Sequence, residues 1–166
     1  RGARGLFPEN SFLGFLMAVK MGVKILEMDL VVSADGQIVV SHEPWLSSKI
    51  CRKPDGSSIS ELEEKSLNIY QMDYALLRRY DFGTKGHPDF PNQKPVRSLK
   101  PLLSEVVKGA KSVAEENKLG EIKFNLELKS EPDWYGTYVP EPATFVKMVL
   151  AELKRLEIEN QVYLQS

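Results

Sequence analysis

Apolar side chains recur at helical spacing near the start of the chain. Residues 12–19 carry them at intervals of three and four, which predicts an amphipathic helix. Asn10 or Ser11 can cap this helix after Pro8, and Gly22 stands where a helix commonly stops.

Strand-like sequence follows directly. Residues 25–32 are apolar and β-branched around two acids, and residues 37–42 form a second run of this kind. Asp35-Gly36 between them is a turn dipeptide, so the segment predicts a β-hairpin.

The turn determines which residues of the hairpin face one another. If Asp35 and Gly36 form a two-residue turn, Asp29 falls opposite His42. Directly opposed residues have Cα atoms about 4.5–5.5 Å apart and side chains on one face, so we expect His42 beside Asp29. A bulge would shift the register by one residue and turn His42 to the opposite face.

Residues 44–97 differ from the rest of the chain. They are rich in proline and glycine and contain one short helical patch, near residues 73–80. Structureless loops of this length are uncommon, which favours a functional loop or a small inserted subdomain.

The remaining sequence alternates between helical and strand-like patterns. Helices are expected at 99–116 and 143–156, and strands at 123–129 and 161–165. This alternation is typical of βα units with a largely parallel sheet, so the fold class is predicted to be α/β.

Composition narrows the possible partners. The 166 residues are 42% hydrophobic and 27% charged, which is ordinary for a globular protein, and the net charge is −1. We therefore expect no nucleic acid partner and no electrostatic binding to anionic membranes. No apolar run approaches the roughly 20 residues of a membrane span. The single cysteine, Cys51, cannot form an internal disulfide and says little about the compartment.

The first expected strand carries two acids two positions apart. Glu27 and Asp29 therefore point to one face, while Leu26, Met28 and Leu30 point to the other. Adjacent carboxylates in a protein interior repel unless a proton or a cation lies between them, and hard oxygen ligands favour Mg²⁺ or Ca²⁺. A half-exposed strand with a solvated acidic face explains the pair equally well.

The expected strand at 123–129 repeats this arrangement. Glu127 and Lys129 share one face with Asn125, and apolar residues share the other. An amphipathic edge strand in water is one interpretation. The apolar-faced helices on either side favour another, in which the polar face points into a barrel, where site residues gather at the C-terminal ends of strands. A third carboxylate beside a lysine suits a cation and a phosphate.

Histidine, arginine and lysine side chains supply the other candidate site residues. His42 would return near the acidic pair, which suits general acid or base catalysis, although a lone histidine is more often a surface or structural residue. His87 is interpreted as an ordinary loop residue. Arg1, Arg4 and Lys129 are candidate phosphate contacts, with a basic, frayed terminus as the alternative for the two arginines.

Taken in order, these motifs resemble those of the glycerophosphodiester phosphodiesterase family. That family begins with His-Arg-Gly and Pro-Glu-Asn-Thr, continues with Glu-x-Asp, Asp-Gly and His-Asp, and later has Glu-x-Lys. The corresponding segments here are Arg1-Gly2, Pro8-Glu9-Asn10-Ser11, Glu27-Met28-Asp29, Asp35-Gly36, His42-Glu43 and Glu127-Leu128-Lys129. The shared order and spacing make the resemblance far more specific than any single motif.

The resemblance implies a TIM-type (β/α) barrel with a metal-dependent site at the C-terminal ends of its strands. It implies roles for six residues: Glu27, Asp29 and Glu127 as ligands of Mg²⁺ or Ca²⁺, His42 as one of two catalytic histidines, and Arg1 and Lys129 as phosphate contacts. Glu9 and Asn10 lie near the site in the family pattern, without an assigned role.

The resemblance is incomplete in two respects. The family's first catalytic histidine would immediately precede Arg1, and a complete barrel needs roughly 250 residues. We therefore expect residues 1–166 to be a single incomplete barrel domain, with residues 44–97 inserted over the barrel mouth. Most aromatic residues pack in cores, but those of the insertion are also candidates for shaping substrate choice. They are Trp45, Tyr70, Tyr80 and Phe82.

The expected reaction is metal-dependent hydrolysis of a small-molecule glycerophosphodiester to glycerol 3-phosphate and an alcohol. The nearest alternative is a phosphodiesterase of the phospholipase C or D kind on the same scaffold. Another is a non-catalytic phosphate-binding barrel that keeps the metal site. A periplasmic or secreted location is preferred to a cytoplasmic one. The leaving alcohol and the oligomeric state are not predicted.

Overall fold

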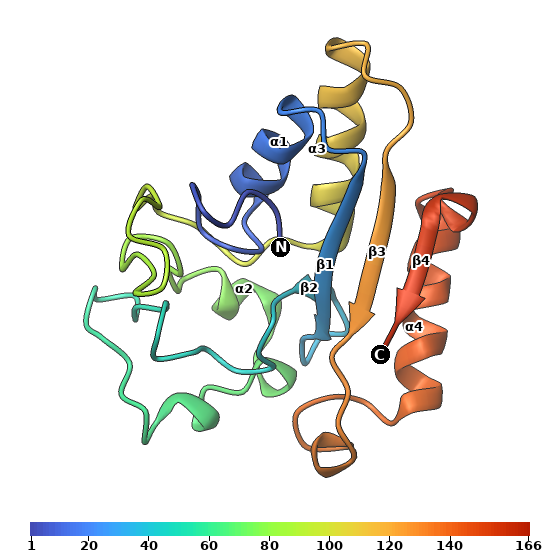
Figure 1. Ribbon diagram of the computed structural model, residues 1–166. Helices are drawn as coiled ribbons and strands as arrows, with labels where there is room; N and C mark the ends of the chain where they lie inside the picture. Colours follow the sequence, from blue (N-terminus) through green and yellow to red (C-terminus); the bar gives the residue numbers. More distant parts are fainter.

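The computed structural model describes all residues from 1 to 166 and contains one four-stranded sheet (Figure 1). The strand order is β2-β1-β3-β4, with bounds β1 Ile25–Val32, β2 Ile38–Val40, β3 Lys123–Leu128 and β4 Val162–Gln165. β2 runs antiparallel to β1, whereas β1, β3 and β4 are parallel. The α/β class and the parallel βα units are confirmed. The sheet of these four strands is open, so its closure into a barrel stays a prediction.

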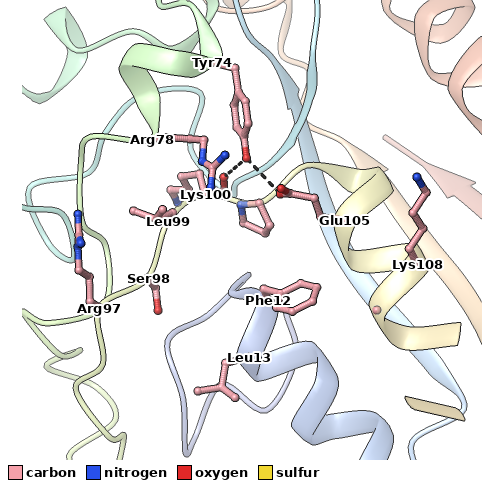
Figure 2. Close-up of a pocket in the computed structure, with 12 residues that line it drawn as sticks. Phe12, Leu13, Tyr74, Arg78, Arg97, Ser98, Leu99, Lys100, Glu105 and Lys108 are labelled. Atoms are coloured by element: carbon pink, nitrogen blue, oxygen red, sulfur yellow. Dashed lines mark hydrogen bonds between the residues drawn. The ribbon is translucent and has the colours of Figure 1, made fainter. Parts of the chain in front are cut away.

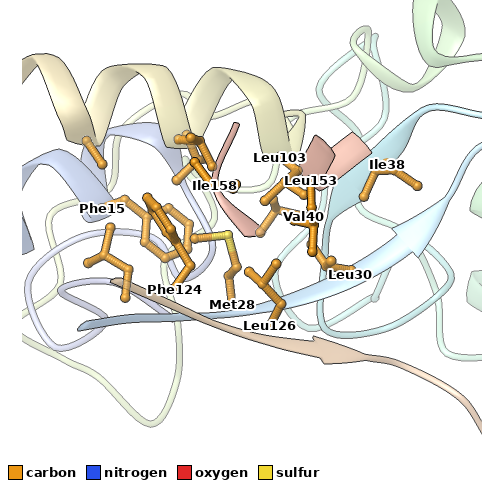
Figure 3. Packing of buried hydrophobic residues seen from close by; sticks show 14 of the residues in the cluster. Phe15, Met28, Leu30, Ile38, Val40, Leu103, Phe124, Leu126, Leu153 and Ile158 are labelled. Atoms are coloured by element: carbon orange, nitrogen blue, oxygen red, sulfur yellow. The ribbon is translucent and has the colours of Figure 1, made fainter. Parts of the chain in front are cut away.

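Three long helices cover one face of this sheet (Figures 1 and 3). They are α1 (Phe12–Lys20), α3 (Leu103–Glu116) and α4 (Pro142–Arg155). Alternate residues of β1 point into the resulting core and are at most 2% exposed: Leu26, Met28 and Leu30. Burial of one such side chain stabilises the fold by about 1.5–3 kcal/mol, so the apolar face of β1 turns towards the helices. The opposite face is left for Glu27 and Asp29.

Helix α3 begins at Leu103, later than the sequence pattern predicted. The carbonyl of Pro101 accepts a hydrogen bond from the N–H of Val40 (2.9 Å), so the chain before the helix runs beside β2. The helical conformation is disfavoured for Lys100, which precedes Pro101, so the helix does not extend back to residue 99. The carboxylate of Glu105 then accepts from the N–H of Leu102 (2.8 Å) and caps the helix.

The hairpin register differs by one residue from the predicted one. Leu30 pairs with Val40, and the N–H of Ser41 donates to the carbonyl of Asp29 (3.0 Å). Asp29 therefore stands opposite Ser41, and the prediction that it faces His42 was wrong.

The cause is a turn of three residues instead of two. The N–H of Gly36 donates to the Ser33 carbonyl (2.9 Å), and the N–H of Ser33 donates to the Gln37 carbonyl (3.0 Å). Gly36 has a φ of 78°, in the left-handed region. This is a type I turn followed by a glycine bulge, which uses the same Asp-Gly dipeptide as a two-residue turn. The extra residue shifts every later pair by one.

Residues 44–97 fold into short helical turns around a second hydrophobic cluster. The turns are η1 (Glu64–Ser66), η2 (Ile69–Gln71) and α2 (Tyr74–Leu77). The cluster has 10 buried residues, and Val31 and Val39 of the hairpin are among them. The insertion therefore packs directly on the end of the hairpin.

The aromatic residues of the insertion have different surroundings. Phe82 is buried in the second cluster, where it is a core residue. Tyr80 packs against the same cluster, and Tyr70 packs against the main core. Only Trp45 of the four candidates packs against neither cluster.

Two further short turns complete the chain, η3 (Pro132–Trp134) after β3 and η4 (Glu159–Gln161) before β4. None of the helices combines the length and the apolar character needed to cross a bilayer.

Candidate active site

Three carboxylates converge between two neighbouring strands. Glu27 and Asp29 extend from β1, and Glu127 extends from β3 directly opposite Asp29 in the parallel pair. One carboxylate oxygen from each residue lies within 4.8 Å of the other two. The predicted convergence of these side chains is confirmed.

Asp29 is the buried centre of the carboxylate cluster, with an exposed fraction of 0%. Its Oδ2 atom accepts a hydrogen bond from Asn10 Nδ2 (2.8 Å) and lies 3.2 Å from Arg1 Nε. Its Oδ1 atom has no hydrogen-bond partner and lies 3.8 Å from Lys129 Nζ. An unsatisfied buried carboxylate oxygen costs free energy, and a cation could satisfy Oδ1.

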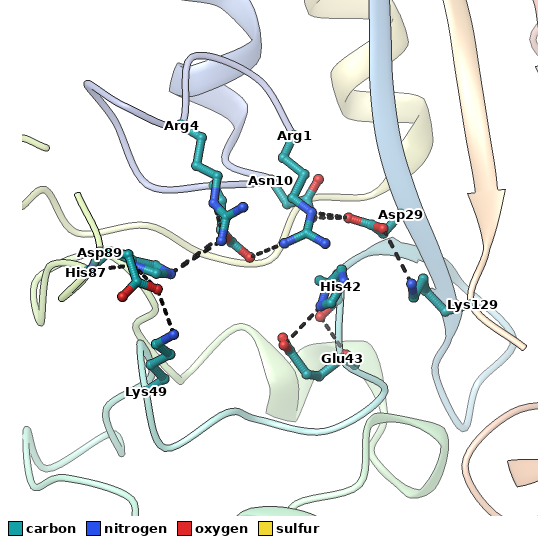
Figure 4. Close-up of polar contacts among 12 residues, drawn as sticks. Arg1, Arg4, Asn10, Asp29, His42, Glu43, Lys49, His87, Asp89 and Lys129 are labelled. Atoms are coloured by element: carbon teal, nitrogen blue, oxygen red, sulfur yellow. Dashed lines mark hydrogen bonds and ion pairs between the residues drawn. The ribbon is translucent and has the colours of Figure 1, made fainter. Parts of the chain in front are cut away.

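Basic side chains balance the carboxylates (Figure 4). Arg1 contacts Asp29 and also Glu9, whose Oε1 lies 3.5 Å from Arg1 Nη1. Lys129 Nζ lies 2.6 Å from Glu127 Oε1. Arg1 and Lys129, the predicted phosphate contacts, therefore lie at the carboxylate cluster, where they serve as its counterions.

Asn10 has a role at this site that the sequence left open. It is fully buried, and its backbone is in the left-handed region at φ 51°. Ser11 caps α1 in its place by accepting from the N–H of Gly14 (3.0 Å), which frees the Asn10 amide to hold Asp29. The signal in the sequence was the Pro-Glu-Asn motif, but a capping residue is the commoner use of asparagine before a helix.

Glu9 joins the N-terminal loop to the insertion. Its Oε2 lies 2.5 Å from Arg4 Nε and 3.8 Å from His87 Nε2. The His87 side chain is only 4% exposed and packs edge-to-face on Phe90, with ring centroids 4.9 Å apart. Burial lowers the pKa of His87, against the effect of Glu9, and favours the neutral ring. His87 is a loop residue as predicted, but a buried one.

His42 pairs with the residue that follows it. β2 ends two residues earlier, so strand alternation does not determine where His42 points. Figure 4 shows its ring below the Arg1–Asp29 contact, beside Glu43, with Nδ1 2.9 Å from Glu43 Oε1. The ring therefore lies at the same end of β1 as the carboxylate cluster, despite the shifted register.

The Glu43 carboxylate determines which nitrogen of His42 carries a proton. Burial raises the pKa of Glu43, but the hydrogen bond with His42 and the positive charge of Lys100 outweigh it and lower that pKa to about 2. An ionised Glu43 can only accept, so Nδ1 of His42 donates to it. The Nε2 atom is then free for a reacting oxygen.

A separate cleft of about 540 Å³ is lined by α1, α2, α3 and the segment 97–101 (Figure 2). In it the Tyr74 hydroxyl lies within hydrogen-bond distance of two acceptors, the Lys100 carbonyl (2.9 Å) and a Glu105 carboxylate oxygen (3.2 Å), which share its single proton. None of the predicted site residues lines this cleft, so its size does not mark it as the active site.

Similar sequences are found among known proteins. Residues 1–166 match the model of the glycerophosphoryl diester phosphodiesterase family. The uncharacterised protein YqiK of Bacillus subtilis is 26% identical over 166 residues, which cover 100% of this chain and 55% of YqiK. YhdW of the same organism, provisionally named a glycerophosphodiester phosphodiesterase, is 30% identical over 82% of this chain and 45% of YhdW.

Solved structures are similar as well. A protein of Silicibacter pomeroyi, provisionally described as a glycerophosphoryl diester phosphodiesterase, is 31% identical with a TM-score of 0.80, over 99% of this chain and 54% of that protein. An Oleispira antarctica phosphodiesterase, solved with its product sn-glycerol-3-phosphate, is 23% identical with a TM-score of 0.62, over 99% of this chain and 53% of the other. This second likeness concerns the fold alone. The chain spans about half the length of these relatives. Its sequence over residues 1–166 places it in the glycerophosphoryl diester phosphodiesterase family.

Proposed function

We propose that the protein containing this chain hydrolyses glycerophosphodiesters to glycerol 3-phosphate and an alcohol, with a divalent cation as cofactor. The convergence of Glu27, Asp29 and Glu127 beside Arg1 and Lys129 carries this proposal. Membership of the family supports the substrate class.

The donor set fits Mg²⁺ or Ca²⁺, because these ions prefer carboxylate oxygens to sulfur or imidazole ligands. Asp29 Oδ1 lacks a hydrogen-bond partner, as a ligand atom awaiting a cation would. The Glu27 and Glu127 side chains are 35% and 30% exposed, so a cation can reach them from solvent. Bound there, it would polarise the phosphate oxygens and stabilise developing charge.

Charge balance explains why Arg1 and Lys129 can bind substrate. With a divalent cation present, the three carboxylates no longer need both basic side chains as counterions. Three carboxylates, a divalent cation, two basic side chains and a singly charged phosphodiester together are neutral. Once Arg1 and Lys129 leave the carboxylates, the negative charge of the phosphodiester therefore contributes to balancing their positive charge.

His42 is the proposed general acid or base at this phosphate. Its Nδ1 is held by Glu43, so Nε2 is presented to the reacting oxygen in one tautomer. We further propose that the full-length chain closes the sheet into a TIM-type barrel, with residues 44–97 over its mouth.

A substrate panel tests this function. The full-length protein is given glycerophosphoglycerol, glycerophosphocholine, a lysophospholipid and phosphatidylinositol. Free glycerol 3-phosphate is measured for the first two, and the headgroup or headgroup phosphate released from the two lipids is measured for the others. We expect glycerol 3-phosphate from the two glycerophosphodiesters, with the two lipids cleaved far more slowly. Faster cleavage of either lipid would assign the protein to the phospholipase-like alternative. No cleavage of any of them would favour the non-catalytic barrel.

A further inference from the structure

Two tryptophans and a tyrosine form a half-buried aromatic cluster. The Trp45 ring meets Trp134 edge-to-face, with centroids 5.6 Å apart and an interplanar angle of 80°. It meets Tyr138 in the same way, at 5.4 Å and 67°. Each of the three residues is partly exposed. The cluster therefore presents aromatic surface to solvent.

The aromatic cluster lies close to the proposed site along the chain. Trp45 follows His42 by three residues, and Trp134 follows Lys129 by five. An extended chain covers at most about 3.6 Å per residue, so their Cα atoms lie within about 11 and 18 Å of those site residues.

The two segments that carry the cluster are held together. Asn68 Nδ2 of the insertion donates to the carbonyl of Thr137 in the loop after β3 (2.8 Å), and Trp45 pairs with Asn68 in a β-bridge. The first segment follows β2, whose end lies beside Asp29 of β1, because the N–H of Ser41 donates to the Asp29 carbonyl. The second follows β3, which carries Glu127 (Figure 1). The cluster thus has a fixed position at this end of the sheet.

A cation already occupies one face of the cluster. Lys65 Nζ lies 5.3 Å from the centroid of the Trp45 ring, and this ammonium has no carboxylate partner. Lys65 is an exposed residue of η1, so its side chain can leave the ring at little cost. The negative face of a tryptophan ring attracts cations, and aromatic clusters of this kind bind quaternary ammonium groups.

We propose that this cluster binds the trimethylammonium group of choline, so that glycerophosphocholine is the preferred substrate. The inference rests on the proposed function and names the alcohol that leaves. A quaternary ammonium has no N–H to satisfy, so aromatic faces are sufficient for it. A primary ammonium such as that of ethanolamine would need hydrogen-bond acceptors as well. In the bound state choline displaces Lys65 from the Trp45 ring.

Tryptophan fluorescence offers an optical test, because both tryptophans of residues 1–166 belong to the cluster, and the part of the response that is lost in Trp45→Phe comes from it. The full-length protein is titrated with choline and, separately, with 3,3-dimethylbutanol, the neutral analogue of the same shape, while tryptophan fluorescence is recorded. We expect a saturable change with choline and a much smaller one with 3,3-dimethylbutanol. Equal responses to the two compounds, or no response to choline, would overturn the proposal.

Three variants sharpen this test. Trp45→Phe keeps an aromatic ring but weakens its attraction for cations, so choline binding should weaken about 3- to 30-fold. Lys65→Gln removes the competing ammonium and should tighten choline binding, while Lys20→Gln, an exposed lysine at the end of α1, serves as its matched control. Equal choline affinity in Lys65→Gln and Lys20→Gln would count against the displacement step. Thermal unfolding confirms that each variant is folded.

Turnover gives an independent measure. The ratio of kcat/KM for glycerophosphocholine to that for glycerophosphoglycerol should exceed one and fall several-fold in Trp45→Phe. A ratio near one in the wild type would refute the choline preference while leaving hydrolysis itself intact. Fluorescence needs no turnover, so failure of the cation site and failure of the proposed enzyme activity give different results.

Discussion

Asn10 combines a left-handed backbone conformation with a side-chain hydrogen bond to the Asp29 carboxylate. Its left-handed φ of 51° aims the amide at Asp29 Oδ2, 2.8 Å away. We expect Asn10→Gly, which tolerates this φ, to lose about 10–100-fold in divalent cation affinity, because groups that orient metal ligands have effects of this size. Asn10→Ala should show the same loss and also unfold more easily by about 1 kcal/mol. Calorimetric titration with Mg²⁺ and Ca²⁺ and thermal unfolding measure the two effects. Unchanged cation affinity in Asn10→Gly would show that the contact is only structural.

Replacement of His42 separates catalysis from stability. If the ring acts as acid or base, His42→Ala should lower kcat by roughly 10²–10⁴-fold with little change in the melting temperature. A large loss of stability with an unchanged kcat would instead indicate a structural histidine.

The neighbouring Glu43 makes a pH-dependent contribution to stability. Its pKa in the folded protein is about 2, lowered from 4.5 by His42 and Lys100 against the effect of burial. A lowered carboxyl pKa stabilises the fold above the ordinary pKa, and this stabilisation is lost as pH falls towards the folded value. Wild type should therefore exceed Glu43→Gln in unfolding free energy at pH 6, and the difference should shrink between pH 4.5 and 2. A difference that stays constant over this range would contradict the assignment.

Residue by residue, the sequence was most informative where strand alternation applies. Glu27, Asp29 and Glu127 could be placed on one face because side chains in a strand alternate. The contacts of Glu9, Asn10 and Arg4 could not be predicted, because they join loops that approach one another only in the folded chain. The edge-to-face contact of Trp45 with Trp134 could not be predicted for the same reason, since it also joins two loops.

Among the elements, the turn at Gly36 fixes the hairpin register. A Cβ atom added there would lie 3.6 Å from Met148 Cε, an ordinary contact, so the cost of Gly36→Ala comes from its φ of 78°. We expect this variant to lose about 1–2 kcal/mol of unfolding free energy. Gly5→Ala, where nothing lies within 4 Å of the added atom, is the matched control and should change stability by no more than about 0.5 kcal/mol. Equal stability of the two variants would argue against the three-residue turn.

The elements themselves followed from the sequence pattern, whereas their limits did not. Residues 25–32 form the predicted strand β1, since local pattern and burial agree there. The start of α3 depended on the chain around Pro101, which can be extended or helical. The hairpin register depended on Gly36, which suits both a two-residue and a three-residue turn. A choice of this kind is made by packing and hydrogen bonds beyond the local sequence.

At the scale of the whole molecule, the site forms where three parts of the chain meet. The N-terminal loop brings Arg1 and Asn10, the hairpin brings Asp29 and His42, and β3 brings Glu127. The helices bury the other face of the sheet and so hold these side chains in place. The packing of residues 44–97 could not be predicted, because proline and glycine indicate turns without specifying the contacts that join them.

In the proposed mechanism, hydrolysis depends on a divalent cation held by Glu27, Asp29 and Glu127. The most direct measurement is the rate of glycerol 3-phosphate release from glycerophosphoglycerol by the full-length protein, after chelation and after Mg²⁺ or Ca²⁺ is restored. We expect chelation to abolish activity and one of the two ions to restore it. Asp29→Asn should remain at least about 10²-fold slower with either ion, whereas the exposed Asp55→Asn should behave as wild type. Full activity of the metal-stripped protein, or of Asp29→Asn, would show that hydrolysis does not depend on a cation at these carboxylates.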